Sequence, residues 1–338
     1  MKSNVLLIYT GGTIGMIEHP ETGVLMAFDF EHLNKQIPEL SKLDMDLKAI
    51  SLGEPIDSSD MSPVIWQDIA QIIVDNYEDY DGFVVLHGSD TMAFSASALS
   101  FMLQGLKKPV IFTGSQLPIG TIRTDGKENL ITAIEIAAAK DADGNAIVNE
   151  VAIYFEYSLY RGNRTTKVSA NAFEAFLSPN YPELAVAGVD IRYDTNALFK
   201  TRKRQLHFNG EMDDRVALMK IFPGFSTKVY ERLFDIDQTR AVIIESFGAG
   251  NVPNNKDFYK MIEDYISKGG IVINTTQCYT GNVEQGKYAN STTFNTLGVV
   301  SGKDITTEAA ITKIMHLLGN YSSTEEIKSL FEQSLVGE

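Results

Sequence analysis

A buried strand that ends in a glycine-rich turn constrains this chain more than any other stretch. Val5–Tyr9 is a run of five apolar residues, the pattern of a parallel strand covered on both faces. Residues 10–15 (TGGTIG) follow, and their glycines allow a sharp turn and the close approach of another group. An open α/β sheet places its site at such a strand end. We therefore expect an α/β fold with a functional site at this turn.

The spacing of this turn argues against a nucleotide site. Gly11, Gly12 and Gly15 do not fit G-x-G-x-x-G, and no lysine follows to complete a phosphate-binding G-x-x-x-x-G-K-[ST] motif. Two hydroxyl side chains, Thr10 and Thr13, remain as its chemistry. A threonine in a turn usually bonds only to nearby backbone. Residue type alone therefore favours a turn-forming role for Thr13 over a catalytic one.

Composition restricts the class of protein and its partners. A chain of 338 residues exceeds one typical core, so we expect two domains. A net charge of −15 disfavours nucleic acid as a partner. The only cysteine, Cys278, excludes an internal disulfide and fits a reducing compartment. The first apolar run is too short for a signal peptide, and no stretch approaches the ~20 apolar residues of a membrane span. These features predict a cytoplasmic protein.

Apolar runs that alternate with helical patterns indicate the larger domain. We expect strands at 83–87, 109–113 and 151–155. We also expect four helices: one at 28–40, one that begins at Pro63, one that ends at about Leu103 and one that follows Asp125. This alternation predicts βαβ units and a mostly parallel sheet flanked by helices. Residues 190–215 carry basic and acidic runs without a long apolar stretch, which is typical of a solvated loop or hairpin.

A smaller α/β domain with its own parallel sheet is expected in the second half. The pattern predicts strands at 216–222, 241–246 and 270–274, with helices from about 226, 254, 306 and 323. Ser323 and Glu326 have the spacing of a capping box. We therefore expect a catalytic domain at 1–195, a linker at 196–215 and a C-terminal domain at 216–338.

Several predicted strands of the first half end in similar polar turns. The C-terminal ends of parallel strands lie along one edge, so these turns converge. The side chains expected at the site are Thr13, Ser58, Ser59, Ser89, Asp90 and Lys167. His87 has no second His or Cys at ligand spacing, so we expect no metal site there and expect His87 to hydrogen-bond at its strand end.

Hydroxyls, a carboxylate and a lysine suit nucleophilic acyl transfer without histidine. An attacking hydroxyl must lose its proton, and a lysine can accept one when burial and dipoles favour its neutral form. Asp90 can hold such a lysine and can also pair with a substrate ammonium. Lys167 can equally be a surface charge beside Arg161 and Arg164. The residues alone leave both interpretations open.

The same segments resemble a known family. Residues 7–15 (LIYTGGTIG) and 82–92 (GFVVLHGSDTM) are similar to the two signature segments of the bacterial-type asparaginase/glutaminase family. Residues 57–61 (DSSDM), 161–167 (RGNRTTK) and 248–251 (GAGN) resemble further family segments in the same order. The similarity spans nearly the whole chain. Residues 160–167 (YRGNRTTK) resemble the corresponding segment of the cytosolic type I L-asparaginases.

The resemblance implies that Thr13 is the nucleophile that forms an acyl-enzyme with the side-chain carbonyl of L-asparagine. It implies proton transfer by Ser89, Asp90 and Lys167. It also implies that Asp57, Ser58 and Ser59 hold the α-carboxylate and α-amino groups of the substrate. The products are L-aspartate and ammonia, and no cofactor is implied. Family members are usually homodimers or homotetramers with sites near subunit contacts.

Three positions depart from the family pattern. Relatives usually have Thr where this chain has Ser89. Many carry a Tyr where this chain has Val24, so Tyr288 becomes the candidate phenol. Some bacterial relatives bind a second, allosteric asparagine through an Arg at the position of Glu245, with counterparts of Thr276 and Cys278. The reversed charge at Glu245 leaves allostery an open question.

Two other functions are compatible with these motifs. One is the ammonia-releasing subunit of a tRNA-dependent amidotransferase, a protein longer than this chain. The acidic surface expected for this chain disfavours binding of tRNA. The other is a non-catalytic amino-acid sensor on the same fold. A sensor does not require Thr13, Ser89 and Lys167 together.

Overall fold

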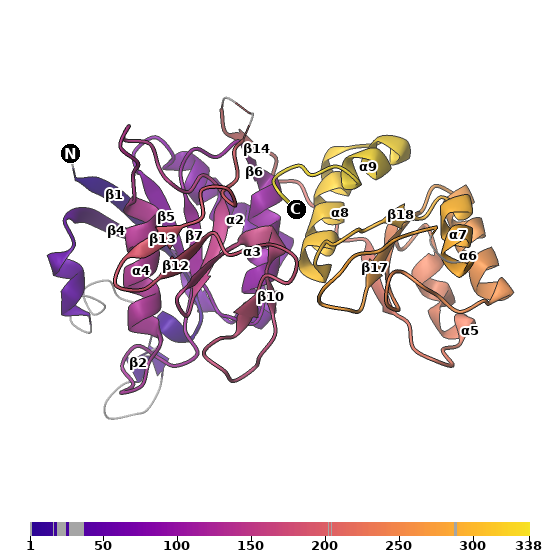
Figure 1. The fold of residues 1–338 in the computed structure, drawn as a ribbon, viewed down its shortest axis with the longest axis horizontal. Coiled ribbons are helices and arrows are strands. Elements are labelled where there is room, and N and C mark those ends of the chain that lie inside the picture. The colour runs from indigo at the N-terminus through magenta and orange to yellow at the C-terminus, as the bar shows by residue number, and fades with distance from the viewer. Residues whose placement is uncertain are drawn as a thin grey trace. The chain divides into compact units, whose positions relative to one another are not determined.

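The chain divides into two compact units, residues 1–209 and 210–338. The computed structural model describes residues 2–15, 17–18, 25–26, 37–201, 203, 205–286 and 289–338, with backbone only at 17–18, 25–26 and 289–291. The division falls within the segment expected to be the linker, and the limits 196 and 215 stay a prediction. Each unit is an α/β structure with its own sheet, as expected (Figure 1).

The first unit is built on an eight-stranded sheet in the order β13-β12-β9-β8-β7-β5-β1-β4. Neighbouring strands from β4 to β8 run parallel, and the remaining pairs run antiparallel. The strands are β1 (Ser3–Gly11), β4 (Met45–Ile56), β5 (Gly82–Leu86), β7 (Val110–Thr113), β8 (Val151–Phe155), β9 (Ser158–Arg161), β12 (Ala185–Ala187) and β13 (Ile191–Tyr193). The parallel half therefore aligns the ends of β1, β5 and β7.

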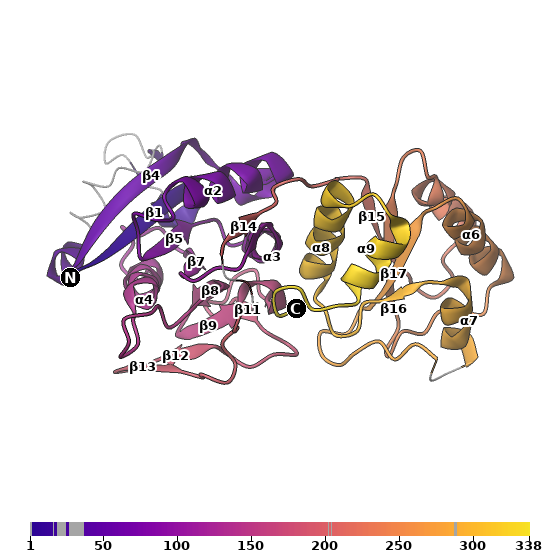
Figure 2. The same ribbon diagram turned by 90° about the horizontal axis from the view of Figure 1, so that it is seen from above.

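Helices cover both faces of this sheet. Helix α4 (Gly126–Ala138) lies on one face, and α2 (Pro63–Asp75) and α3 (Met92–Met102) lie on the other (Figure 2). Val5 and Leu7 of β1 share a core with Leu130 and Ala133 of α4. Residues Gly82–Leu86 are all buried, which explains their unbroken apolar run.

One strand of this unit was not predicted from the sequence, and one predicted helix lies mostly outside the described residues. The strand β4 was missed, because its residues alternate between partly buried and exposed side chains and include a glycine and a proline. The helix expected at 28–40 falls mostly on residues outside the described ranges. Its last part is the 3-10 turn η2 (Pro38–Lys42).

Short elements complete the first unit. The 3-10 turns are η1 (Thr13–Gly15), η3 (Ser58–Asp60) and η4 (Gly162–Arg164). Two-stranded pairs are formed by β2 (Ile17–Glu18) with β3 (Leu25–Met26), by β10 (Thr166–Lys167) with β11 (Phe176–Leu177), and by β6 (Leu103–Gln104) with β14 (His207–Phe208). The turns η1 and η3 and the strand β10 carry Thr13, Ser58, Ser59 and Lys167, and Ser89 and Asp90 lie between β5 and α3.

The second unit is a four-stranded parallel sheet in the order β15-β16-β17-β18. Its strands are β15 (Val216–Lys220), β16 (Ala241–Ser246), β17 (Ile271–Thr276) and β18 (Val300–Ser301). Its helical elements are α5 (Thr227–Tyr230), η5 (Glu231–Phe234), α6 (Lys256–Ser267), α7 (Ala289–Leu297), α8 (Thr307–Asn320) and α9 (Thr324–Phe331). Alternate residues of β16 face opposite cores, since Val242 packs with α6 and Ile243 with α8.

Candidate active site

Two glycine-rich turns at one edge of the large sheet pack directly on each other. Gly12 has a φ of +82°, and a Cβ on it would lie 2.5 Å from the backbone nitrogen of Gly88. A Cβ on Gly88 would in turn lie 2.5 Å from Ser58 Oγ. Real Cβ atoms do not approach other heavy atoms so closely, so both positions require glycine. The two glycines thus bring the segments of Thr13, Ser58 and Ser89 into contact.

The first turn offers one accessible hydroxyl. Thr10 is buried, and its Oγ1 donates to the carbonyl oxygen of Leu86 at 3.0 Å. Thr13 begins η1 and is partly exposed, whereas the two residues after it are buried. The Gly15 N–H closes this turn by donating to the Gly12 carbonyl oxygen at 3.4 Å. Thr13, and not Thr10, is therefore the hydroxyl of this turn that a ligand can reach.

The second segment is organised by the Asp57 carboxylate. Asp57 Oδ1 accepts hydrogen bonds from Ser59 N at 2.9 Å and from Ser59 Oγ at 2.8 Å. The backbone bond and then the hydroxyl bond lower the pKa of Asp57, so it is ionised at neutral pH. Ser58 is buried, and its carbonyl oxygen accepts from Thr91 Oγ1 at 2.6 Å. This last bond joins η3 to the turn that carries Ser89.

Lys167 reaches the same turn from a distant part of the sequence. Its Nζ donates to Ser89 Oγ at 2.8 Å and lies 2.6 Å from Asp90 Oδ1. The Lys167 side chain is 15% exposed, whereas that of Asp90 is 70% exposed. Three residues that sequence reasoning placed together are therefore in direct contact. Lys167 is therefore a paired and mostly buried side chain at this turn, and not an isolated surface charge.

A rigid support positions Lys167. It pairs with Phe176 across the two-stranded β10–β11 ribbon, and Thr165 Oγ1 donates to the Arg161 carbonyl oxygen at 2.7 Å. Arg161 itself is 3% exposed and forms a 2.6 Å ion pair with the buried Glu150. A paired buried charge resists displacement, because separating the pair leaves an uncompensated charge in the interior. The Arg161–Glu150 ion pair and the Thr165 hydrogen bond thus hold the backbone that precedes Lys167 in place.

His87 is structural, as the sequence suggested. It is fully buried, its Nδ1 lies 2.6 Å from the Gly88 carbonyl oxygen, and its Nε2 lies 2.8 Å from Ser95 Oγ. A carbonyl only accepts, so Nδ1 carries the proton and Nε2 accepts from Ser95, which itself accepts from Trp66 Nε1 at 2.9 Å. Burial lowers the pKa of His87 to about 4, so the ring is neutral at pH 7.

A further polar residue at this edge was not singled out from the sequence. Gln116 follows β7, and its Oε1 lies 3.5 Å from Ser89 Oγ. Asp125 directly precedes α4, but its side chain makes no capping bond there. It accepts instead from the backbone N–H groups of Gln116 and Leu117 at 2.9–3.1 Å. The signal in the sequence was the TGSQ turn at the end of a buried strand.

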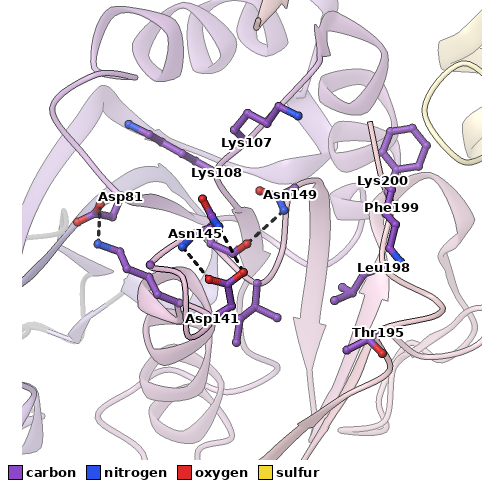
Figure 3. Close-up of a pocket in the computed structure, with 14 residues that line it drawn as sticks. Asp81, Lys107, Lys108, Asp141, Asn145, Asn149, Thr195, Leu198, Phe199 and Lys200 are labelled. Atoms are coloured by element: carbon purple, nitrogen blue, oxygen red, sulfur yellow. Dashed lines mark hydrogen bonds and ion pairs between the residues drawn. The ribbon is translucent and has the colours of Figure 1, made fainter. Parts of the chain in front are cut away.

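A cavity of about 680 Å³ elsewhere in the first unit is separate from this site. Its lining includes Asp81 and Lys108, just before β5 and β7, and several residues of the segment 140–149, which precedes β8 (Figure 3). Asp81 pairs with Lys140 at 3.0 Å. These residues precede the parallel strands, whereas the candidate site follows them. The cavity therefore lies at the opposite edge of the sheet and includes none of the expected site residues.

Family models match the chain in two parts. The family model described as "Asparaginase, N-terminal" matches residues 4–199, and "Glutaminase/Asparaginase C-terminal domain" matches residues 215–331. The chain belongs to the asparaginase family. Among curated relatives, "L-asparaginase 1" of Escherichia coli (strain K12) is 42% identical to this chain. The match covers 100% of this chain and 98% of that relative.

A solved structure and a further curated relative are also similar to this chain. The crystal structure of L-asparaginase I from Vibrio cholerae has a TM-score of 0.90 and 38% identity, covering 100% of this chain and 99% of that one. A glutamyl-tRNA(Gln) amidotransferase component from Pyrococcus abyssi is 31% identical over 99% of this chain and 76% of that protein.

The structure describes only some of the residues at which this chain departs from the family pattern. Tyr288, the candidate phenol, and Val24 lie outside the described residues. In the second unit, Glu245 is 9% exposed, and its Oε1 accepts from Thr307 Oγ1 at 2.6 Å while its Oε2 lies 3.5 Å from Lys220 Nζ.

The two other positions of the suggested allosteric asparagine site form a local turn. Thr276 Oγ1 donates to the carbonyl oxygen of Gly248 at 2.6 Å and accepts from the Cys278 N–H at 3.1 Å. Cys278 is exposed. The carboxylate of Glu245 and the hydroxyl of Thr276 therefore have partners within the second unit, and Cys278 contributes its backbone N–H to the turn.

Proposed function

We propose that this chain hydrolyses L-asparagine to L-aspartate and ammonia, with Thr13 as the nucleophile. The observation that carries the proposal is the contact of Lys167 Nζ with both Ser89 Oγ and Asp90 Oδ1, beside the glycine turn that carries Thr13. This arrangement offers an attacking hydroxyl, a proton acceptor and a second hydroxyl on adjoining segments.

In the first step, Thr13 Oγ1 attacks the side-chain carbonyl carbon of asparagine and passes its proton to the Ser89–Lys167 pair. Backbone N–H groups of the glycine turns stabilise the oxyanion, each contributing roughly 3 kcal/mol to the transition state. The tetrahedral intermediate collapses, the C–N bond breaks, and the leaving nitrogen takes a proton from the same pair. The step leaves ammonia and an ester on Thr13.

In the second step, water attacks the ester carbon and returns a proton to Thr13 through the same groups, which releases L-aspartate. The α-ammonium and α-carboxylate of the substrate are held by the segment Asp57–Ser59 and by Asp90. The ionised Asp57 and the exposed Asp90 supply negative charge for the ammonium. The hydroxyl and backbone N–H groups of Ser58 are suited to the carboxylate, while Ser59 orients the Asp57 carboxylate through its own two donors.

The amidotransferase function is the weaker alternative. The identity to its representative is 31%, against 42% to an L-asparaginase, and the net charge of −15 opposes binding of tRNA. A non-catalytic sensor has no need for a lysine held against a serine hydroxyl. Both alternatives differ from the proposal in what the isolated chain releases from asparagine.

The test is direct measurement of ammonia and aspartate released from L-asparagine by the purified full chain, with L-glutamine in parallel. We expect the two products in equal amounts from asparagine. Release from glutamine alone would favour the amidotransferase alternative. A folded chain that binds asparagine but releases no ammonia would favour the sensor.

We further propose that the enzyme is cytoplasmic and works as a homodimer or homotetramer. The single, exposed Cys278 supports a reducing compartment. Across the described residues, no helix is long and apolar enough to cross a membrane. Light scattering at several protein concentrations measures the oligomeric state.

A further inference from the structure

Gln116 connects the turn of Ser89 to the ribbon of Lys167. Its Oε1 lies 3.5 Å from Ser89 Oγ, and its Nε2 donates to the carbonyl oxygen of Ala172 at 2.8 Å. Ala172 lies in the loop between β10 and β11, and its N–H donates to Ser169 Oγ at 3.0 Å. One amide side chain therefore contacts both segments that build the Ser89–Lys167 pair.

The orientation of this amide follows from its neighbours. The Ala172 carbonyl only accepts, so the NH₂ group of Gln116 must face it and Oε1 must face Ser89. Lys167 Nζ already donates to Ser89 Oγ at 2.8 Å. The proton of Ser89 is then directed away from the ammonium, toward Gln116 Oε1.

The backbone of Gln116 is fixed independently of its side chain. Its N–H donates to both oxygens of Asp125, at 3.1 and 2.9 Å, and the Leu117 N–H donates to Asp125 Oδ1 at 3.1 Å. Asp125 is 6% exposed and also accepts from Asn129 Nδ2 at 3.3 Å. Replacing the Gln116 side chain therefore leaves the turn itself in place.

Ser89 needs such a partner because serine has little rotamer preference of its own. Its β-carbon carries one heavy substituent besides the backbone, so three staggered χ1 values are open to it, whereas a β-branched residue is restricted. The rotamer in the structure places Oγ 2.8 Å from Lys167 Nζ. Ser89 is also only partly buried, so packing alone does not select that rotamer.

We propose that Gln116 is a positioning residue that holds the Ser89 hydroxyl in the rotamer from which it exchanges a proton with Lys167. The inference rests on the proposed role of Ser89 in asparagine hydrolysis. When Lys167 is charged, Gln116 Oε1 accepts the Ser89 proton. When Lys167 has given up its proton, Ser89 turns the same O–H toward Nζ without leaving the rotamer.

The first experiment compares Gln116→Leu and Gln116→Met with the parent chain in ammonia release. We expect kcat to fall about tenfold, because a change of that size corresponds to the free energy of one neutral hydrogen bond. KM should change less than about twofold. Gln104→Leu is the matched control. Gln104 also bridges two groups, the Phe101 carbonyl oxygen and Lys203 Nζ, but contacts none of the site residues. Its loss is expected to leave kcat unchanged.

The second experiment repeats Gln116→Leu in a Ser89→Thr background, where the added methyl restricts χ1. The loss in kcat is expected to shrink from about tenfold to at most about twofold. An equal loss in both backgrounds would show that Gln116 only braces the loop of Ala172, and unchanged kcat in both Gln116 variants would also overturn the inference. Ser89→Ala separates the two proposals: a nearly fully active variant removes Ser89 from catalysis, while an inactive one retains that role whatever Gln116 does.

Discussion

Lys167 Nζ lies 2.6 Å from Asp90 Oδ1, yet the two side chains differ sharply in exposure, at 15% and 70%. Solvent around the carboxylate screens this pair, so the contact contributes little to stability. It leaves the second carboxylate oxygen of Asp90 accessible to a ligand cation, while Lys167 keeps its bond to Ser89. The pair is therefore arranged for chemistry at the sheet edge more than for holding the fold.

Removing the Thr13 hydroxyl should abolish asparagine hydrolysis and leave the fold intact. Thr13→Ala deletes the attacking oxygen at a partly exposed turn position, so we expect kcat to fall by at least about 10³-fold with an unchanged melting temperature. Thr13→Ser keeps a hydroxyl and should retain more turnover than Thr13→Ala. The nucleophile assignment would be wrong if the purified Ala variant kept a substantial fraction of the parent kcat.

The buried His87 should make stability depend on pH between 6.5 and 4. Burial lowers its pKa from 6.5 to about 4, so in this window the unfolded chain binds a proton that the folded chain does not. The free energy of unfolding therefore falls as the pH falls, by about 3 kcal/mol from this group, and levels off below pH 4. Above pH 6.5 the group contributes no pH dependence.

Urea unfolding at pH 7 and pH 4.5 measures this effect. In His87→Gln the difference between the two pH values should be smaller than in the parent by about 2 kcal/mol. His207→Gln is the matched control, because His207 is exposed in β14. An identical pH dependence in the parent and in His87→Gln would contradict the assignment.

A buried ion pair should stabilise the end of the second unit. Lys313 Nζ lies 2.5 Å from Glu338 Oε1, and both side chains are 2% exposed. The Glu338 carboxylate also accepts from the backbone N–H groups of Leu335 and Val336. Glu338→Gln leaves the ammonium buried without its counter-charge, so we expect a loss of about 3–5 kcal/mol in unfolding free energy.

The matched control for this pair is the solvent-facing one in α9. Glu325 lies 3.1 Å from Lys328 and its side chain is 84% exposed, so Glu325→Gln should cost less than about 1 kcal/mol. Both variants are compared with the parent by urea unfolding. Similar small losses in the two variants would mean that the Lys313 ammonium does not need the charge of Glu338 while it keeps its bonds to the carbonyl oxygens of Phe331 and Gln333.

The sequence predicted the parallel strands well because their burial leaves a simple signal. β5 and β8 are buried at every residue, and both were predicted from unbroken apolar runs. β4 was not predicted, because a half-exposed edge strand mixes charged and apolar residues and derives its structure from pairing with β1. The helix α7 was missed for a similar reason, since it contains Asn, Ser and Thr and little apolar periodicity.

The site could be predicted where it depends on strand ends and not where it depends on side-chain direction. The rule that parallel strands end together was enough to bring the turns of Thr13 and Ser89 to one edge. It does not account for Lys167, which follows the antiparallel strand β9 and lies on the separate ribbon β10–β11. It could not show that Asp125 binds the backbone of residues 116–117 instead of capping its own helix. A carboxylate before a helix fits both geometries, and the choice is made by tertiary contacts.

Lys167 offers the sharpest test of the proton path, because charge and proton transfer can be separated. Lys167→Met keeps the apolar stem but removes the ammonium, and Lys167→Arg keeps a positive charge that cannot give up its proton near neutral pH. We expect both variants to fold and both to lose at least about 10²-fold in kcat. Lys107→Met is the control, since Lys107 is an exposed lysine of the same unit beside the separate cavity. Thermal melts confirm folding alongside kcat. An active Arg variant would mean that Lys167 supplies only positive charge to the site, and its assignment as the proton acceptor would have to be abandoned.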